Sequence, residues 1–215
     1  MSEVLCYGFA EDALSCAVMT QLVAYCNALD TSRVPLHFRP GFPENKRGYG
    51  HIKKMIPKIC SMAENAGLAT FILTDLDMTT CSPELIRDWF NSTEEKPVLP
   101  DPILFRIAER EVEAWVLADR QGIAGYLGIA ESNFSSDPDS LGDPKENLLN
   151  IVRAKGHKRY HKDMLPSETS HVGPEYNPRL CAFVNDHWGV DRAAEKSPSL
   201  RRAIAAINRF KEERS

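Results

Sequence analysis

Apolar residues along this chain fall into two patterns, short uninterrupted runs and longer stretches in which they recur every three or four positions. The short runs predict strands, and they lie at 4–7, 34–39, 68–74 and 103–108. The periodic stretches predict helices, and they lie at 11–29, 52–67, 82–90 and 108–119. The segment 40–50 is rich in glycine and proline and predicts a loop. Asp143-Pro144 and Ser197-Pro198 each pair a capping residue with a proline, which predicts two further helix starts.

The alternation of strands with helices predicts an α/β fold with a mainly parallel sheet flanked by helices. The run 68–74 (LATFILT) is apolar without interruption, which is typical of a strand buried on both faces of a parallel sheet. We expect an α/β core over 1–125 and a mostly helical C-terminal extension over 126–215 packed on that core.

Composition narrows the class of protein. Of the 215 residues 43% are apolar and 26% are charged, which excludes a wholly disordered or fibrous chain. No apolar run approaches the roughly 20 residues that a membrane span needs, so we expect no membrane protein. The N-terminal segment has no basic region, so we expect no signal peptide. The six cysteines form no C-x-x-C pair, which favours a reduced, cytoplasmic chain.

The net charge of −4 hides an uneven distribution. Segment 33–58 has seven basic residues and one acid, whereas 84–143 has thirteen acids and five basic residues. Basic residues prevail again over 145–163 and 192–215. A metal-dependent enzyme that acts on a phosphate polymer needs such an arrangement, because carboxylates hold cations and cations hold the polymer backbone. Solvated helix faces of mixed charge are the alternative explanation.

Asp75 and Asp77 carry the sharpest chemical signal, because they directly follow the buried run 68–74. Ligands of open α/β sheets gather beyond the carboxyl ends of the strands, and paired carboxylates there suit Mg²⁺. Glu11 follows the first predicted strand, where a carboxylate either caps a helix or joins the same site. Glu113 is one of three acids at 109–113; helical spacing places Glu109 and Glu113 on one face and turns Glu111 away.

Taken together, these segments resemble the TOPRIM (topoisomerase–primase) superfamily, and within it small prokaryotic proteins related to the overcoming-lysogenization-defect nucleases. The resemblance rests on G-F-A-E-D-A-L with Glu11, T-D-L-D with Asp75 and Asp77, R-E-V-E-A-W-V-L-A-D with Glu113 and Asp119, D-P-K at 143–145, and G-P-E-Y-N at 173–177. It implies a Mg²⁺-dependent site that cleaves phosphodiester bonds, in a toxin or anti-phage defence system. Many TOPRIM proteins have Glu-Gly directly after the first strand; this chain has Tyr7-Gly8, and Glu11 lies one helical turn further on.

On this interpretation the chain is a nuclease that uses Mg²⁺ or Mn²⁺. Its metal-binding and catalytic residues are Glu11, Asp75, Asp77 and Glu113. Its candidate contacts to the DNA or RNA backbone are Lys145, Lys155, Lys158 and Arg159. The sequence leaves a partner protein and an oligomeric state open.

Two other interpretations fit the same residues. Tyr7 in place of the glutamate keeps open the alternative of a non-catalytic TOPRIM-like module that binds nucleic acid or a partner protein. The segment DLDMT also matches the D-x-D-x-T signature of haloacid-dehalogenase-like phosphatases, in which the first Asp is a nucleophile. Those enzymes need a later acidic pair after another apolar strand, whereas Asp137, Asp139 and Asp143 lie in a Ser/Pro/Gly segment.

Overall fold

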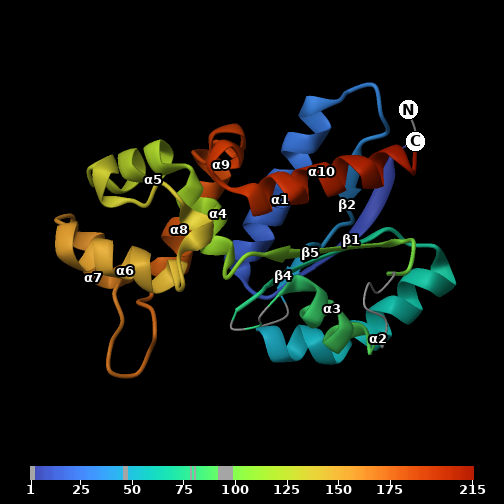
Figure 1. The fold of residues 1–215 in the computed structure, drawn as a ribbon, viewed down its shortest axis with the longest axis horizontal. Coiled ribbons are helices and arrows are strands. Elements are labelled where there is room, and N and C mark those ends of the chain that lie inside the picture. The colour runs from blue at the N-terminus through green and yellow to red at the C-terminus, as the bar shows by residue number, and fades with distance from the viewer. Residues whose placement is uncertain (1–2, 46–47, 78, 80, 92–98) are drawn as a thin grey trace.

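A parallel β-sheet forms the centre of the molecule (Figure 1). The computed structural model describes residues 3–45, 48–77, 79, 81–91 and 99–215. Within these residues the sheet has the order β2-β1-β4-β5, and a short strand β3 pairs with the end of β1. All of these pairings are parallel, so the expected α/β fold is confirmed. The strand bounds are β1 Val4–Ala10, β2 Leu36–Phe38, β3 Glu44–Asn45, β4 Thr70–Asp75 and β5 Ile103–Ala108.

Helices cover both faces of the sheet (Figure 1). Helices α2 (Tyr49–Ala66) and α3 (Ser82–Phe90) lie on one face, and α1 (Ala13–Leu29) and α10 (Pro198–Glu212) lie on the other. Successive strand residues point to opposite faces, so Phe71 and Leu73 of β4 join the apolar cluster of α1 and α10. Ile72 joins the cluster of α2 and α3 instead. Every residue of β4 is buried, as the run 68–74 predicts.

The remaining helices form a lobe beside the sheet. They are α4 (Val112–Ala118), α5 (Arg120–Leu127), α6 (Pro144–Lys155), α7 (Arg159–Met164), α8 (Tyr176–Asp186) and α9 (Val190–Lys196). Helix α8 packs on α1, α9 packs on α4, and α10 returns to pack along β5. One apolar cluster therefore runs from the sheet into the C-terminal helices. Among the described residues, no helix combines the length and apolar character that crossing a membrane requires.

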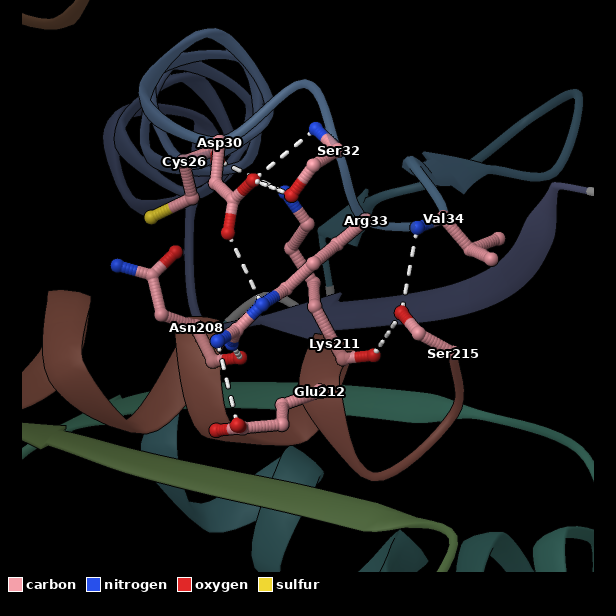
Figure 2. A network of polar contacts seen from close by, with 9 residues as sticks. All are labelled: Cys26, Asp30, Ser32, Arg33, Val34, Asn208, Lys211, Glu212 and Ser215. Atoms are coloured by element: carbon pink, nitrogen blue, oxygen red, sulfur yellow. Dashed lines mark hydrogen bonds and ion pairs between the residues drawn. The ribbon is translucent and has the colours of Figure 1, made fainter.

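Polar contacts fix the last turns of α10 to the end of α1 (Figure 2). The Lys211 side chain is only 2% exposed, and its Nζ donates a hydrogen bond of 2.8 Å to the Cys26 carbonyl oxygen. Arg33 bridges Asp30 at 2.9 Å and Glu212 at 3.2 Å. The Val34 amide donates to the Ser215 hydroxyl at 3.2 Å. These contacts hold the end of α10 in place against the sheet.

Helix boundaries follow the capping signals in the sequence. The predicted cap-plus-proline starts are confirmed, because the side chains of Asp143 and Ser197 accept hydrogen bonds from backbone amides of α6 and α10. Gly67 ends α2 with a left-handed φ of 59°, as predicted. Helix α1 begins at Ala13 rather than at residue 11, because the Asp12 side chain caps it.

Two segment predictions need correction. The first strand does not end at Tyr7: β1 continues through Gly8 to Ala10. A Cβ atom at Gly8 would lie 2.7 Å from side-chain atoms of Phe38 and Pro43, so packing rather than a turn explains this glycine. The segment 40–50 is not wholly a loop, because β3 and the first residues of α2 lie within it. Residues 46–47 of that segment lie outside the described part.

Candidate functional site

The carboxyl ends of β1 and β4 bring Glu11 and Asp75 together. The strands are adjacent and parallel, so the residues that end them lie at one edge of the sheet. Both side chains are buried, at 8% and 9% exposure. The Asp75 amide donates a hydrogen bond of 3.0 Å to Glu11 Oε1, and the Thr74 hydroxyl donates to the same oxygen. Glu11 therefore has a fixed position beside Asp75 rather than a capping role, which Asp12 fills.

Helix α4 adds a third buried carboxylate, Glu113, which is 1% exposed. The Val112 amide in the first turn of α4 donates a hydrogen bond of 2.8 Å to Asp75 Oδ1 and so joins this helix to β4. The Tyr176 hydroxyl of α8 donates to Glu113 Oε1 at 3.1 Å. Three segments that are distant in sequence thus place Glu11, Asp75 and Glu113 at the same edge of the sheet.

The predicted arrangement of the acids at 109–113 is wrong. Strand β5 ends at Ala108, Arg110 has a left-handed φ of 64°, and α4 begins only at Val112. Glu109 and Glu113 therefore do not share a helix face. Glu109 forms an ion pair with Arg202 of α10 at 2.9 Å. Glu111, which helical spacing turned away, points toward the site as Glu113 does, since both contact Lys145.

Lys145 lies among the carboxylates, at the start of α6. Its Nζ is 3.3 Å from Glu111 Oε1 and 3.5 Å from Glu113 Oε1, and its backbone amide donates to Glu111 Oε2 at 2.8 Å. The sequence marks Lys145 only as a contact to nucleic acid and gives no sign of these partners. The sequence did not identify Tyr176 as a residue of the site, and it placed Glu111 away from Glu113. The G-P-E-Y-N motif, which contains Tyr176, is the signal that could have suggested it.

Burial and mutual repulsion raise the pKa values of the carboxyl groups. The pKa of Asp75 is raised well above its ordinary value, by burial first and then by the negative charges of Glu113 and Glu11. Burial also raises the pKa of Glu11, although the hydrogen bond from Thr74 opposes it. Burial raises the pKa of Glu113 to about 7 even with Lys145 opposing the change. In the metal-free chain these carboxyl groups are therefore harder to ionise than ordinary carboxyl groups.

The same carboxylates act on Lys145 in the opposite sense. Burial disfavours its ammonium group, but Glu113 and Glu111 outweigh that cost and raise the pKa of Lys145. Lys145 is therefore charged at neutral pH, and it supplies the positive charge in direct contact with Glu111 and Glu113.

Asp77 lies at the rim of this site. It is exposed and has a left-handed φ of 48°, and its amide donates to the Arg110 carbonyl oxygen at 2.9 Å. Its negative charge contributes to the raised pKa of Asp75, so the two carboxyl groups are near each other. The adjoining residues 78 and 80 lie outside the described part of the chain.

Lys155, Lys158 and Arg159 lie away from the carboxylates. Lys145 and Lys155 stand ten residues apart on α6, which at about 1.5 Å per residue separates their backbones by roughly 15 Å. Lys158 Nζ contacts the Tyr126 carbonyl oxygen at 3.4 Å, and Arg159 is exposed at the start of α7. Figure 1 shows α7 at the far end of the helical lobe from the sheet. The structure therefore separates these three residues from Lys145.

The carboxylate oxygens of this site are the type of ligand that a hard cation such as Mg²⁺ prefers. Three buried carboxyl groups whose ionisation is costly without a counter-ion are the observation that a bound cation would explain. The carboxylates are not arranged as a preformed metal site: within the described residues, no three or more His, Cys, Asp or Glu side chains lie close enough together to coordinate a metal ion. Glu113 is partly neutralised by Lys145 instead, so the ion pair would have to loosen when a cation binds.

Comparisons with protein-family models, with curated proteins and with solved structures give no significant match. The case for a function therefore rests on the residues of the site and on their surroundings.

Proposed function

We propose that the chain is a Mg²⁺-dependent nuclease that hydrolyses phosphodiester bonds at the edge formed by β1, β4 and α4. The observation that carries this proposal is the burial of Glu11, Asp75 and Glu113 at one sheet edge with Lys145 beside them. The TOPRIM-like motifs of the sequence support it, since they contain Asp75 and Glu113, while Glu11 lies one helical turn beyond the position of the family's first glutamate. A prokaryotic defence or toxin system and a cytoplasmic location, which six free cysteines favour, belong to the same proposal.

Each residue of the site has a distinct role in this proposal. Glu11, Asp75 and Glu113 would hold the cation, with Asp77 at the rim as a further ligand. A bound Mg²⁺ would supply Lewis-acid stabilisation of the phosphate and a more acidic water. Thr74 and the Asp75 amide fix one oxygen of Glu11, so that its other oxygen remains for ligand binding. Tyr176 orients Glu113 through its hydroxyl.

Lys145 is suited to act on the substrate itself. Glu113, as a ligand of the cation, would be held in its ionised form and would fix the position of the metal. The Lys145 ammonium is only partly buried and can turn from Glu113 toward a phosphate, where it would offset negative charge in the transition state.

A non-catalytic binding module is the second candidate. The observation that favours it is the internal pairing of Lys145 with Glu111 and Glu113, which neutralises part of the site without a metal. A phosphatase of the haloacid-dehalogenase type has less support. Asp139 accepts hydrogen bonds from Ser197 and Ser199, and Asp143 caps α6, so these acids serve helix starts.

Cleavage assays with matched variants test the proposal. Plasmid DNA and RNA are incubated with the wild-type protein and Mg²⁺ or Mn²⁺, and the proposal expects cleavage that EDTA abolishes. Asp75→Asn and Glu113→Gln should abolish cleavage with the fold retained. Glu146→Gln is the matched control, because Glu146 is an exposed acid on α6 next to Lys145.

Three results distinguish the candidates. Loss of cleavage in both site variants but not in Glu146→Gln supports the nuclease. Binding of nucleic acid without cleavage under any divalent ion favours the binding module. Rapid hydrolysis of p-nitrophenyl phosphate that Asp75→Asn abolishes would replace the nuclease with a phosphatase.

A further inference from the structure

Three arginines meet where the outer strand of the sheet lies against the last helix. Strand β5 ends the strand order, and α10 packs along it (Figure 1). Leu104 and Ala108 of β5 belong to the apolar cluster on the α10 side, and Arg106 lies between them with the same alternation. Arg106 therefore faces α10.

Arg202 and Arg209 belong to the same face of α10. They stand seven residues apart, which is close to two full turns, with Ala206 between them. Ala206 and Arg209 line a hollow of about 400 Å³ together with Leu104 of β5. This shared hollow places the Arg209 side of α10 against the face of β5 that Arg106 occupies.

Two of these three arginines lack the counter-charges that a purely structural cluster would have. Arg202 pairs with Glu109 at 2.9 Å. In the described part of the chain neither Arg106 nor Arg209 has a carboxylate partner, and the buried Nε of Arg106 has no hydrogen-bond partner. Burial lowers the pKa of Arg106, and the positive charges of Arg202 and Arg209 lower it further. Like charges beside a half-buried guanidinium destabilise a fold. An anionic ligand therefore explains the presence of these three arginines better than packing does.

The two acids that line the hollow pair with another arginine instead. Asp101 and Glu213 also line the hollow, and both interact with Arg214, at 3.7 Å and 3.8 Å. Arg214 itself is held over the Phe210 ring, 3.6 Å from the ring centroid. The surplus positive charge therefore remains at Arg106 and Arg209.

The arginines continue from the carboxylate site along the sheet edge. The Arg110 guanidinium donates to the Asp77 carbonyl oxygen at 3.2 Å, and the partner of Arg202 is Glu109, one residue before Arg110. From Arg202 to Arg209 the helix axis advances roughly 10 Å, the length of about three nucleotides of one strand at about 3.4 Å each. Guanidinium groups at this spacing fit phosphates that are about three nucleotides apart on one strand.

We propose that Arg106, Arg202 and Arg209 bind backbone phosphates of a nucleic-acid strand that reaches the carboxylate site along the outer edge of β5. The proposal rests on the proposed function and adds the path of the substrate. This path differs from the one that the sequence suggests, since Lys155, Lys158 and Arg159 lie in the helical lobe. The buried Lys211 network fixes the end of α10 and so keeps the arginines in position before a strand binds (Figure 2).

Binding measured without metal tests this path separately from cleavage. Labelled single-stranded DNA and RNA oligonucleotides are titrated in EDTA at several salt concentrations, with wild type, Arg106→Gln and Arg209→Gln. Each lost phosphate contact should lower the slope of log K against log salt by about 0.7. The matched control is Arg201→Gln, because Arg201 lies on the same helix and its guanidinium donates to the carbonyl oxygens of Ala194 and Glu195.

The result expected is a lower slope for Arg106→Gln and Arg209→Gln and an unchanged slope for Arg201→Gln. Arg106→Gln should fold at least as stably as wild type, because it removes a repelling buried charge. An Arg106→Gln variant that loses stability but not binding would show a structural role and overturn the proposal.

Two further outcomes would also overturn the proposal. The first is a wild-type protein that binds no oligonucleotide. The second is a protein in which Arg106→Gln and Arg209→Gln weaken the binding of inorganic phosphate but not of oligonucleotides. Normal slopes in Arg106→Gln and Arg209→Gln, with cleavage lost in Asp75→Asn, would refute the path while leaving the nuclease in place.

Discussion

Glu113 makes the stability of the metal-free protein depend on pH in an unusual direction. The group is 1% exposed and lies close enough to Asp75 for their charges to repel. Glu113→Gln removes the charge but retains an oxygen that can accept the hydrogen bond from Tyr176. The substitution therefore isolates the electrostatic cost of ionising this side chain in the folded state.

The sign and size of the effect follow from the pKa of Glu113. It is about 7 in the folded chain against an ordinary 4.5, so between these values the folded state holds a proton that the unfolded state has released. The contribution to stability is fully present below pH 4.5 and is lost as the pH rises through about 7. The difference between the folded and the ordinary pKa of Glu113 corresponds to roughly 3 kcal/mol of unfolding free energy, at about 1.4 kcal/mol for each pKa unit.

Urea denaturation in EDTA, from below pH 4.5 to above pH 7, measures this contribution. The unfolding free energy of the wild type minus that of Glu113→Gln should fall across the window by roughly 3 kcal/mol. Glu146→Gln is the control and should change little, because Glu146 is exposed. Saturating Mg²⁺ should restore the wild type at high pH, since a cation relieves the repulsion. A difference that stays flat or rises with pH would refute the reasoning.

Three other substitutions test separate parts of the structure. Asp75→Asn should abolish Mn²⁺ binding in calorimetry, and unchanged metal affinity would exclude Asp75 as a ligand. The same variant should raise the unfolding free energy at pH 7, because Asn can still accept the bond from the Val112 amide without the repelling charge. Asp119→Ala should lower the unfolding free energy by at least about 2 kcal/mol in urea, because its buried carboxylate accepts bonds from the Gly122 and Gly189 amides and from Arg192. A loss similar to that of the exposed control Glu146→Gln would contradict this. Gly8→Ala should cost about 1–3 kcal/mol in thermal denaturation, because its Cβ would collide with Phe38 and Pro43; an unchanged melting temperature would show that β1 and its neighbours can move apart.

Local patterns in the sequence were sufficient to predict the fold class. The apolar run before Asp75 identifies the fully buried strand, and the caps Asp143 and Ser197 identify two helix starts, because both features act over a few residues. The turn at Arg110 was missed. The acids on either side of it have helical spacing, and nothing in a spacing of four indicates that one residue adopts a left-handed φ.

The site was predictable only as far as strand ends reveal it. Glu11 and Asp75 follow neighbouring parallel strands, so their meeting follows from the fold class. Glu111, Lys145 and Tyr176 reach the site from other segments through tertiary packing, which no local pattern encodes. The same limit applies to Arg106, whose neighbours on α10 are about a hundred residues away in the sequence.

A crystal structure of the protein soaked in Mn²⁺ tests the central claim most directly. Anomalous scattering from manganese locates the ion, and the surrounding density shows which carboxylates bind it. The account predicts Mn²⁺ bound between Glu11, Asp75 and Glu113, with Lys145 displaced from Glu113. A site without manganese, in which Lys145 keeps its ion pairs with Glu111 and Glu113, would contradict the account.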